Sequence, residues 1–233
     1  MSTWIVTGAS RGLGRQLVLQ LLQRGHRVLA CARASSELDA LAAHPSGRVR
    51  PLGLDLAQAD LIAPALQSAL TDVDVLAGVI NNAGIGCYKP FLEHGERELI
   101  DILQVNLIAT LQVCHATLPR LLAQGHGHII NIGSDLGRRP LANMAPYVAS
   151  KHGLTGFSHS LLREVKDRGV RVSLVQPGLI DTGFNGGVEG SRGDPASALD
   201  PAELAAAILR LIDMPPHLVV DELTLHPLGQ RDF

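Results

Sequence analysis

Cysteine, net charge and long apolar runs are all scarce in this chain, and each shortage argues against a class of protein. The three cysteines, Cys31, Cys87 and Cys114, lie far apart and form no Cys-x-x-Cys pair. Such a dispersed, odd-numbered set favours a reducing, cytoplasmic setting over a disulfide-stabilised fold. The formal net charge of −2 offers no basic surface for nucleic acid or for an anionic membrane, so we expect neither as a partner.

Membrane segments and metal sites also lack their usual signatures. No apolar run approaches the roughly 18 residues of a membrane-spanning helix. The apolar segment Trp4–Val6 begins so early that we expect no signal peptide. The ten histidines form no His-x-x-x-His pair, and His126 and His128 are better explained as surface residues than as ligands. We therefore expect no metal.

What the chain does contain is an alternation of short β-like runs and longer helical patterns. The expected strands are rich in Val, Ile and Leu with little polar alternation, as in strands that are covered on both faces. They are Thr3–Thr7, Arg27–Ala32, Val49–Leu54, Val75–Asn81, His128–Gly133, Val170–Gln176 and Leu218–Leu225. Helical patterns cover Leu13–Arg24, Ser36–Ala43, Leu61–Thr71, Glu93–Ala123, Tyr147–Arg168 and Pro201–Asp213.

This alternation predicts an α/β fold. Alternating β and α units with right-handed crossovers build a doubly wound, mostly parallel sheet of seven strands flanked by helices. We therefore expect a Rossmann-like, three-layer α/β/α architecture, formed as a single domain over residues 1–233.

Glycine and proline mark the expected breaks. Gly25 and Gly169 each follow a helical pattern and should end it in the left-handed conformation. Pro119 lies inside the fourth helical pattern and should kink or shorten it. Gly183–Leu199, which holds five glycines and few large apolar residues, predicts a mobile loop. Because only Pro227–Phe233 lie beyond the last strand region, we expect this loop to be the lid over a substrate.

The first chemical motif is the glycine-rich segment Thr7–Gly14, which follows the first strand and opens the first helix. Glycines there let the backbone turn tightly and approach a pyrophosphate at the helix N-terminus. The spacing is Gly-x-x-x-Gly-x-Gly, from Gly8 through Gly12 to Gly14. Alone, this segment is also compatible with an ordinary strand-to-helix turn.

The second motif is a tyrosine, Tyr147, four residues before a lysine, Lys151, and thirteen after Ser134. The four-residue spacing places the phenol and the ammonium on one face of a helix. A neighbouring positive charge should stabilise the tyrosinate, so we expect the pKa of Tyr147 to fall toward neutral pH. Such a group would serve as a general acid or base toward an oxygen.

Taken together, these segments resemble the short-chain dehydrogenase/reductase family over nearly the whole chain, from Thr3 to about Leu225. The marks of the resemblance occur in the family's order: the Thr7–Gly14 loop, Asn81-Asn82-Ala83-Gly84, Asn106, Ser134, Tyr147 with Lys151, and Pro177-Gly178 leading to Thr182. The resemblance implies an oxidoreductase that transfers hydride between a nicotinamide cofactor and a carbonyl or alcohol carbon.

The resemblance also implies four catalytic roles. Ser134 would donate a hydrogen bond to the substrate carbonyl oxygen, and Tyr147 would give that oxygen its proton. Lys151 would bind the nicotinamide ribose and lower the pKa of Tyr147, and Asn106 would hold a water in a proton relay. These roles suit the chemistry, because a carbonyl that gains hydride develops alkoxide charge and needs a donor and a proton source.

Cofactor contacts follow from the same resemblance. Asp55 and the Leu56 backbone would bind the adenine, Asn82 to Gly84 would line the adenosine side, and the segment from Pro177 to Thr182 would hold the carboxamide. The full expected set is Gly8, Ser10, Arg11, Gly12, Leu13, Gly14, Arg33, Asp55, Leu56, Asn82, Ala83, Gly84, Tyr147, Lys151, Pro177, Gly178, Ile180 and Thr182. Simpler alternatives remain open, since Asp55 could cap a helix and Ser134 a loop.

Charge at the end of the second strand indicates which cofactor is used. An NAD enzyme usually has a carboxylate there for the ribose hydroxyls, but here no acidic residue precedes Glu37. Arg33 and Arg11 could instead bind a 2′-phosphate, because guanidinium groups bind phosphate in a bidentate fashion. We therefore expect NADP, as NADPH.

The resulting hypothesis is an NADPH-dependent reductase of a small-molecule ketone or aldehyde. Alternatives are an alcohol dehydrogenase in the oxidative direction, a ketoacyl-carrier-protein reductase, for which Arg138 and Arg139 are the only local hint, and a catalytically silent NADP-binding sensor or scaffold. Candidate pocket residues are Cys87, Tyr88, Leu136, Met144, Leu179 and Phe184. Apolar residues on several sides of the fourth and fifth helices, namely Leu118, Leu121, Leu122, Leu154, Leu161 and Leu162, indicate a second buried surface and a homodimer or homotetramer.

Overall fold

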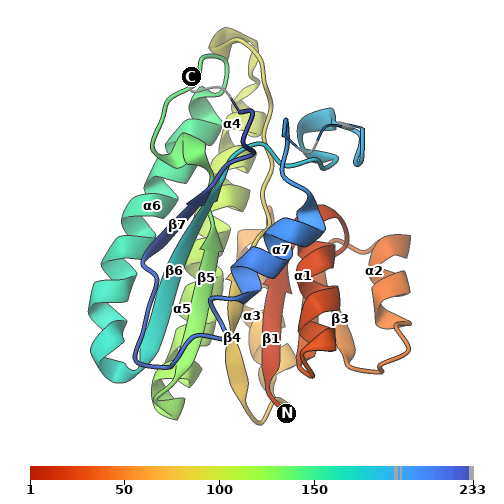
Figure 1. Ribbon diagram of the computed structural model, residues 1–233, viewed down its shortest axis with the longest axis vertical. Coiled ribbons are helices and arrows are strands. Elements are labelled where there is room, and N and C mark those ends of the chain that lie inside the picture. Colours follow the sequence, from red (N-terminus) through yellow and green to blue (C-terminus); the bar gives the residue numbers. More distant parts are fainter. Residues whose placement is uncertain (192–193, 195, 231–233) are drawn as a thin grey trace.

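The computed structural model describes residues 1–191, 194 and 196–230, and its centre is a seven-stranded sheet (Figure 1). The strands are β1 (Thr3–Thr7), β2 (Arg27–Ala32), β3 (Val49–Gly53), β4 (Leu76–Asn81), β5 (Gly127–Ile132), β6 (Val170–Pro177) and β7 (Glu222–Leu225). They lie in the order β3-β2-β1-β4-β5-β6-β7, and each neighbouring pair is parallel. The predicted doubly wound α/β fold is confirmed.

Helices cover both faces of this sheet (Figure 1). They are α1 (Gly12–Gln23), α2 (Ser36–Ala42), α3 (Ala59–Leu70), α4 (Glu96–Leu103), α5 (Ala109–Gln124), α6 (Ala145–Val165) and α7 (Pro201–Leu209). Shorter 3₁₀ turns span Phe91–Glu93, Asp135–Gly137, Lys166–Arg168 and Phe184–Gly186. The buried side chains form one core with α1, α2 and α7 and a second with α3, α5 and α6, so the fold has the three expected layers.

The central strands supply side chains to both cores. In β1, Trp4 and Val6 belong to the core beneath α1 and α7, whereas Ile5 belongs to the core beneath α3 and α5. Successive side chains of a strand point to opposite faces, so a strand covered on both sides must be apolar throughout. This requirement explains why the β-like runs showed little polar alternation.

Three glycines end helices in the left-handed conformation. Gly25 and Gly169 have φ of +86° and +78°, as predicted from their positions. Gly125, with φ of +70°, ends α5 in the same way. A Cβ on Gly169 would overlap the carbonyl oxygen of Gly125, so the C-terminal ends of α5 and α6 are in direct backbone contact.

The predicted single helix over Glu93–Ala123 is wrong in detail. The region begins with a 3₁₀ turn and continues with α4, a π turn over Gln104–Ile108, and α5. The π turn contains Asn106, whose buried side chain forms hydrogen bonds with the backbone of Ile85. π turns often occur where a functional side chain must be directed, and hydrophobic periodicity does not reveal them.

We predicted that Pro119 would kink or shorten its helix, and the shortening is wrong, because α5 runs on to Gln124. Proline removes one backbone donor and leaves the carbonyl four residues earlier without its partner. That carbonyl belongs to His115, and both residues lie on the exposed side of α5, where water can satisfy it. The end of the helix is therefore set by Gly125 rather than by the proline.

Two elements near the C-terminus are shorter than predicted. The last helix ends at Leu209 instead of Asp213, because i→i−3 hydrogen bonds from Leu211 and Ile212 tighten the chain into turns. The last strand is Glu222–Leu225 rather than Leu218–Leu225, since only these four residues pair with β6. Pairing geometry, which composition does not encode, sets the length of an edge strand.

One helical run is long and apolar enough to cross a membrane by length and composition alone. It is the continuous run Glu96–Gln124, with a mean hydropathy of 1.4 over its most apolar window. The sequence expectation considered only unbroken apolar runs and therefore missed it. In this fold α5 packs on β4, β5 and α3, which is the role of a core helix.

The leucines that suggested a second buried surface lie mainly inside the monomer. Leu121, Leu154, Leu161 and Leu162 are buried, three of them in the core beneath α3, α5 and α6, and Leu118 and Leu122 pack against that core. The inference of an interface from these residues was therefore wrong. Other apolar side chains on this region are exposed instead, namely Ile100, Leu103 and Ile108.

The strand order reverses between β1 and β4, and open α/β sheets usually bind ligands at such a switch point. To one side of it the chain continues through β2 and β3, and to the other through β5, β6 and β7. The loops that leave the carboxyl ends of β1 and β4 therefore diverge, which opens a crevice at this edge of the sheet. The loop residues expected to form the site follow β1, β2, β3, β4, β5 and β6.

Candidate active site

The glycine-rich loop after β1 is built by close backbone approach. A Cβ on Gly14 would overlap the carbonyl oxygen of Gly8 and lie 2.6 Å from Asn82 Nδ2. Gly8 has φ of +64°, and its added Cβ would lie 2.9 Å from Ala83 Cα. Side chains at these positions would push the loop away from α1 and from the loop after β4, so the fold requires glycine here.

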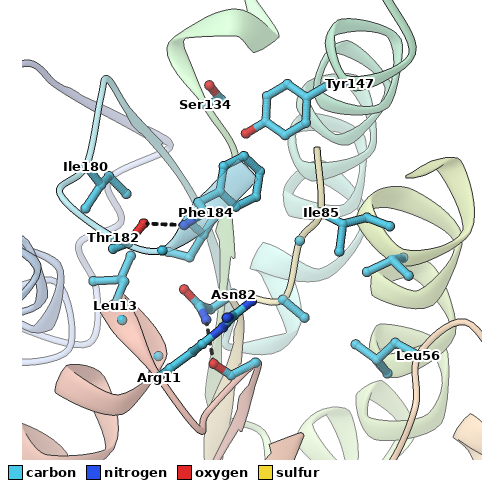
Figure 2. Close-up of a pocket in the computed structure, with 18 of the residues that line it drawn as sticks. Arg11, Leu13, Leu56, Asn82, Ile85, Ser134, Tyr147, Ile180, Thr182 and Phe184 are labelled. Carbon is cyan, nitrogen blue, oxygen red and sulfur yellow. Dashed lines mark hydrogen bonds between the residues drawn. The ribbon is translucent and has the colours of Figure 1, made fainter. Parts of the chain in front are cut away.

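The loop after β4 braces this turn through hydrogen bonds. Asn82 Nδ2 donates to the carbonyl oxygens of Thr7 at 3.0 Å and of Gly8 at 3.2 Å. The Thr7 hydroxyl accepts from the backbone N–H groups of Asn82 and Ala83. Figure 2 shows a hydrogen bond of the Asn82 side chain as a dashed line. The predicted Asn82-Ala83-Gly84 segment is therefore a structural partner of the glycine-rich loop.

Arg11, Arg33 and Asp55 line one end of the same cavity. Arg11 and Arg33 are exposed, with their guanidinium groups accessible from solvent. Asp55 Oδ1 accepts from the backbone N–H of Ala57 at 3.0 Å, and the N-cap of α3 is Gln58, so the helix-cap alternative for Asp55 is wrong.

A carboxylate that sequence reasoning set aside also lines this end of the cavity. It belongs to Glu37, in the first turn of α2. Hydrogen bonds from its own backbone N–H and from the Ser35 hydroxyl lower the pKa of this carboxyl, with a smaller contribution from Arg11. These bonds hold Glu37 at the start of its helix, beside the two arginines.

Ser134, Tyr147 and Lys151 meet at the other end of the cavity. Ser134 follows β5, and its hydroxyl accepts from the backbone N–H of Leu136 at 3.2 Å. Tyr147 and Lys151 lie in the first two turns of α6, with exposures of only 8% and 4%. Figure 2 shows Tyr147 beside Ser134, and all three side chains line the cavity.

The expected effect of Lys151 on Tyr147 is contradicted by the structure. Burial raises the pKa of Tyr147 to about 12; the Ser134 hydroxyl opposes this shift and the charge of Asp135 adds to it. Lys151 Nζ donates to the Ile132 carbonyl oxygen at 2.9 Å and lies 5.6 Å from the centroid of the Tyr147 ring. Burial also lowers the pKa of Lys151 to about 8, which weakens the ammonium that was to stabilise the tyrosinate.

Asn106 lies apart from this cavity. Its Oδ1 accepts from the N–H of Ile85 at 2.8 Å, and its Nδ2 donates to the Ile85 carbonyl at 2.9 Å and to Ser150 Oγ at 3.1 Å. The side chain thus fixes the loop after β4 against α6. Its role in a proton relay stays a prediction.

The segment after β6 forms the third wall. Pro177, Gly178, Ile180 and Thr182 line the cavity as expected. Thr182 Oγ1 accepts from the N–H of Phe184 at 3.3 Å, and the Phe184 ring lies 5.7 Å from that of Tyr147 (Figure 2). This wall therefore positions an aromatic ring next to the tyrosine, with the two ring planes tilted by 60°.

Apart from Asn106, the predicted catalytic and cofactor residues line one cavity of about 1150 Å³. Among the candidate pocket residues, Tyr88, Leu136, Met144, Leu179 and Phe184 line it and Cys87 does not. Sequence reasoning missed Asp135 and Gln230, which also line it. An acidic residue directly after Ser134 was a visible signal, whereas nothing local to Gln230 indicated its position. No group of three or more His, Cys, Asp or Glu side chains in the described part of the chain could hold a metal ion.

A family model described as short chain dehydrogenase matches residues 2–192, which is most of the chain. The chain belongs to the short-chain dehydrogenase family. Similar members include carbonyl reductase family member 4 of Danio rerio, 34% identical over 91% of each chain. The 3-oxoacyl-[acyl-carrier-protein] reductase of Vibrio cholerae is 34% identical over 97% of this chain and 95% of its own.

Solved short-chain dehydrogenase structures share the whole architecture. An alcohol dehydrogenase from the archaeon Thermococcus sibiricus, complexed with 5-hydroxy-NADP, superimposes with a TM-score of 0.93 and 28% identity over 100% of this chain and 99% of its own. A metagenomic short-chain oxidoreductase in complex with NADP gives a TM-score of 0.85 and 31% identity over 97% of this chain and 96% of its own. Family membership makes this chain an oxidoreductase acting on alcohol or carbonyl groups.

Proposed function

We propose that this short-chain dehydrogenase reduces a ketone or aldehyde with NADPH. The observation that carries the proposal is that Ser134, Tyr147 and Lys151 line the same cavity as the glycine-rich loop. A proton donor and a nucleotide-binding loop that share one cavity provide both halves of a carbonyl reduction. Relatives named carbonyl reductase and structures solved with NADP support it.

The residues of the cavity fit a dinucleotide. The turn from Gly8 to Gly14 exposes backbone N–H groups at the start of α1, where a pyrophosphate is favoured. Asp55 and Leu56 would bind the adenine, and the segment from Pro177 to Thr182 the carboxamide. When bound, the cofactor supplies the hydride, and the protein supplies position and proton.

The proton chemistry belongs to Ser134 and Tyr147. Because the pKa of Tyr147 is about 12, the phenol keeps its proton at neutral pH and can donate it to a developing alkoxide. Ser134 would donate a hydrogen bond to the same oxygen, and Lys151 would bind the ribose. Reduction uses the protonated tyrosine as the acid, and the reverse oxidation would use the tyrosinate as the base.

We further propose that Arg33 and Arg11 select NADPH over NADH. Replacing Arg33 with aspartate removes a phosphate ligand and introduces a charge that repels the 2′-phosphate. We expect the ratio of kcat/KM for NADPH to that for NADH to fall by at least about tenfold, which corresponds to the roughly 1.4 kcal/mol of one charge-assisted contact. Steady-state kinetics with both cofactors measure this ratio.

A matched control for this variant is Arg15→Asp, because Arg15 is an exposed arginine of α1 that does not line the cavity. It makes the same charge change and should leave the ratio within about twofold. Equal use of NADH and NADPH by the wild-type protein would show that the assignment of NADPH is wrong.

We also propose that residues 1–233 form a single domain, that one of its loops closes over the substrate, and that the protein is cytoplasmic. The loop over residues 183–199 would close on the substrate, although residues 192, 193 and 195 of that prediction lie outside the described chain. Phe184, at its start, already contacts the Tyr147 ring. The free thiols of Cys31, Cys87 and Cys114 support a cytoplasmic location.

We also propose that the protein is a homodimer or homotetramer. Ile100, Leu103 and Ile108 expose 59%, 39% and 41% of their area on adjacent turns of one helical run. Neighbouring exposed apolar side chains on one element are typical of a contact surface. Light scattering at micromolar concentration would give a multiple of the 24.7 kDa monomer mass.

A ketoacyl-carrier-protein reductase is the second candidate, favoured by relatives of that name at 34% identity. The basic patch that this role would use is thin, because Arg138 is paired with Glu222. An NADPH-oxidation screen over ketones, diketones, aldehydes and a 3-oxoacyl thioester tests both functions. Cofactor binding with no turnover across the whole screen would favour a silent sensor instead.

A further inference from the structure

A carboxylate lies directly beside the proposed oxyanion donor. Ser134 Oγ donates to Asp135 Oδ1 at 3.1 Å, and the backbone N–H of Leu136 donates to the same oxygen at 2.9 Å. The Asp135 side chain is only about 10% exposed, yet it lines the cavity. A charged group in this position acts on whatever the cavity binds, because burial leaves little water to screen it.

The segment after β7 holds this carboxylate in place. Gln230 Nε2 donates to Asp135 Oδ2 at 2.7 Å, and His226 Nε2 lies 3.4 Å from the same oxygen. Gln230 also accepts from the N–H of Leu179 at 3.0 Å. The tail fits closely here, since a Cβ on Gly178 would overlap Gln230 Oε1 and lie 2.8 Å from His226 Cδ2.

In the free protein, both oxygens of the Asp135 carboxylate accept hydrogen bonds. The bond from Ser134 must break during catalysis. Ser134 has a single hydroxyl proton, which it now gives to Asp135 Oδ1. To bind a carbonyl oxygen, the hydroxyl must turn away from Asp135. Oδ1 then keeps only the backbone N–H of Leu136 as a donor, and it has a free acceptor position at the place where the substrate lies.

We propose that Asp135 is a specificity residue, and that the substrate carries a hydroxyl or amino group one or two carbons from its carbonyl which replaces Ser134 as the donor to Asp135 Oδ1. This inference rests on the proposed function, since it assigns Ser134 to the carbonyl oxygen. The donor group must lie close to the carbonyl, because the carbonyl oxygen and Asp135 Oδ1 would both lie within hydrogen-bond distance of Ser134 Oγ.

The charge of Asp135 adds a second criterion. Asp135 raises the pKa of Tyr147, as a negative charge near the phenol should. Neutral hydroxyl and cationic amino groups would be favoured beside it, and a carboxylate in the same position would be repelled. Lys151 does not neutralise Asp135, because its ammonium is directed at the Ile132 carbonyl.

The test compares substrates that differ only in the donor. Hydroxyacetone and 2-butanone have equal numbers of heavy atoms, as do 4-hydroxy-2-butanone and 2-pentanone. We expect the wild-type protein to prefer the hydroxylated member of at least one pair by at least about tenfold in kcat/KM, because a site that binds a substrate hydroxyl rejects the analogue that lacks it.

Variants of Asp135 then locate the cause. Asp135→Leu removes the acceptor and should bring the preference to within about twofold, whereas Asp135→Asn keeps an acceptor oxygen and should leave an intermediate preference. Asp101→Asn is the matched control: Asp101 lines the cavity but pairs with Arg97, and its variant should keep the wild-type ratio. A ratio measured within one variant does not depend on how much of that protein is folded.

The outcomes separate this inference from the proposed function. Equal turnover within both pairs by the wild-type protein, or an unchanged preference in Asp135→Leu, overturns the inference and leaves the reductase function standing. Turnover of other ketones but of none of these four also overturns it. Absence of NADPH-dependent turnover with any carbonyl compound overturns the reductase function itself, and the inference with it.

Discussion

Replacing Tyr147 with phenylalanine is expected to lower kcat/KM for carbonyl reduction by about 10²–10⁴-fold, the usual contribution of a positioned general acid. The phenol is the only tyrosine hydroxyl beside Ser134, and its pKa of about 12 keeps it protonated at neutral pH. Phenylalanine retains the ring that packs on Phe184, so the cavity keeps its shape while the proton donor is lost. Initial rates of NADPH oxidation measure the change.

The other tyrosine of the chain provides the control. Tyr88 also lines the cavity but is 56% exposed, and Tyr88→Phe should reduce the rate far less than Tyr147→Phe does. Circular dichroism would verify that both variants are folded. If Tyr147→Phe retained full activity, the protonation mechanism proposed for this site would be wrong.

Gly14→Ala is expected to have the largest effect on stability among single-methyl additions around the cofactor loop. The new Cβ would overlap the carbonyl oxygen of Gly8, which is backbone, and lie 2.6 Å from Asn82 Nδ2, which two hydrogen bonds hold in place. Such overpacking costs about 1–3 kcal/mol or more. Urea unfolding should show the loss, and cofactor binding should fall with it because the loop must shift away from α1.

Gly156→Ala is the matched control for this change. Gly156 lies inside α6, and a Cβ added there would meet nothing within 4 Å. Alanine is favoured over glycine in a helix by roughly 1 kcal/mol, so this variant should be slightly more stable than the wild-type protein. Destabilisation by both variants to the same extent would contradict the packing explanation for Gly14.

The fold was largely predictable because its signals are local. β1 and β2 were predicted with the right bounds, since strands buried on both faces must be apolar throughout. The π turn at Gln104–Ile108 was not predictable, because it exists to direct Asn106 at Ile85, a contact between residues 21 positions apart. The length of β7 depends likewise on its partner β6.

The site was predictable as a set of residues but not in its electrostatics. The order of Ser134, Tyr147 and Lys151 along the chain was sufficient to predict that these three side chains meet in one cavity. The sign of the Tyr147 pKa shift depends on burial and on where the Lys151 ammonium is directed, and spacing along a helix reports neither. The contact of Gln230 with Asp135 joins residues 95 positions apart, which no local pattern encodes.

The backbone contact between Gly125 and Gly169 joins the C-terminal ends of α5 and α6, the two longest helices, so both helices extend from one fixed point. Asn106 lies just before the start of α5, and Tyr147 and Lys151 lie at the start of α6, at the opposite ends of these helices from the glycine contact. With a rise of 1.5 Å per residue, Tyr147 lies roughly 30 Å from the fixed point at Gly169. A tilt of only about 2° there would move the phenol by roughly 1 Å, and a displacement of that size can cost a reaction about 10²-fold in rate. The glycine pair therefore helps to fix the position of Tyr147 from the opposite end of α6.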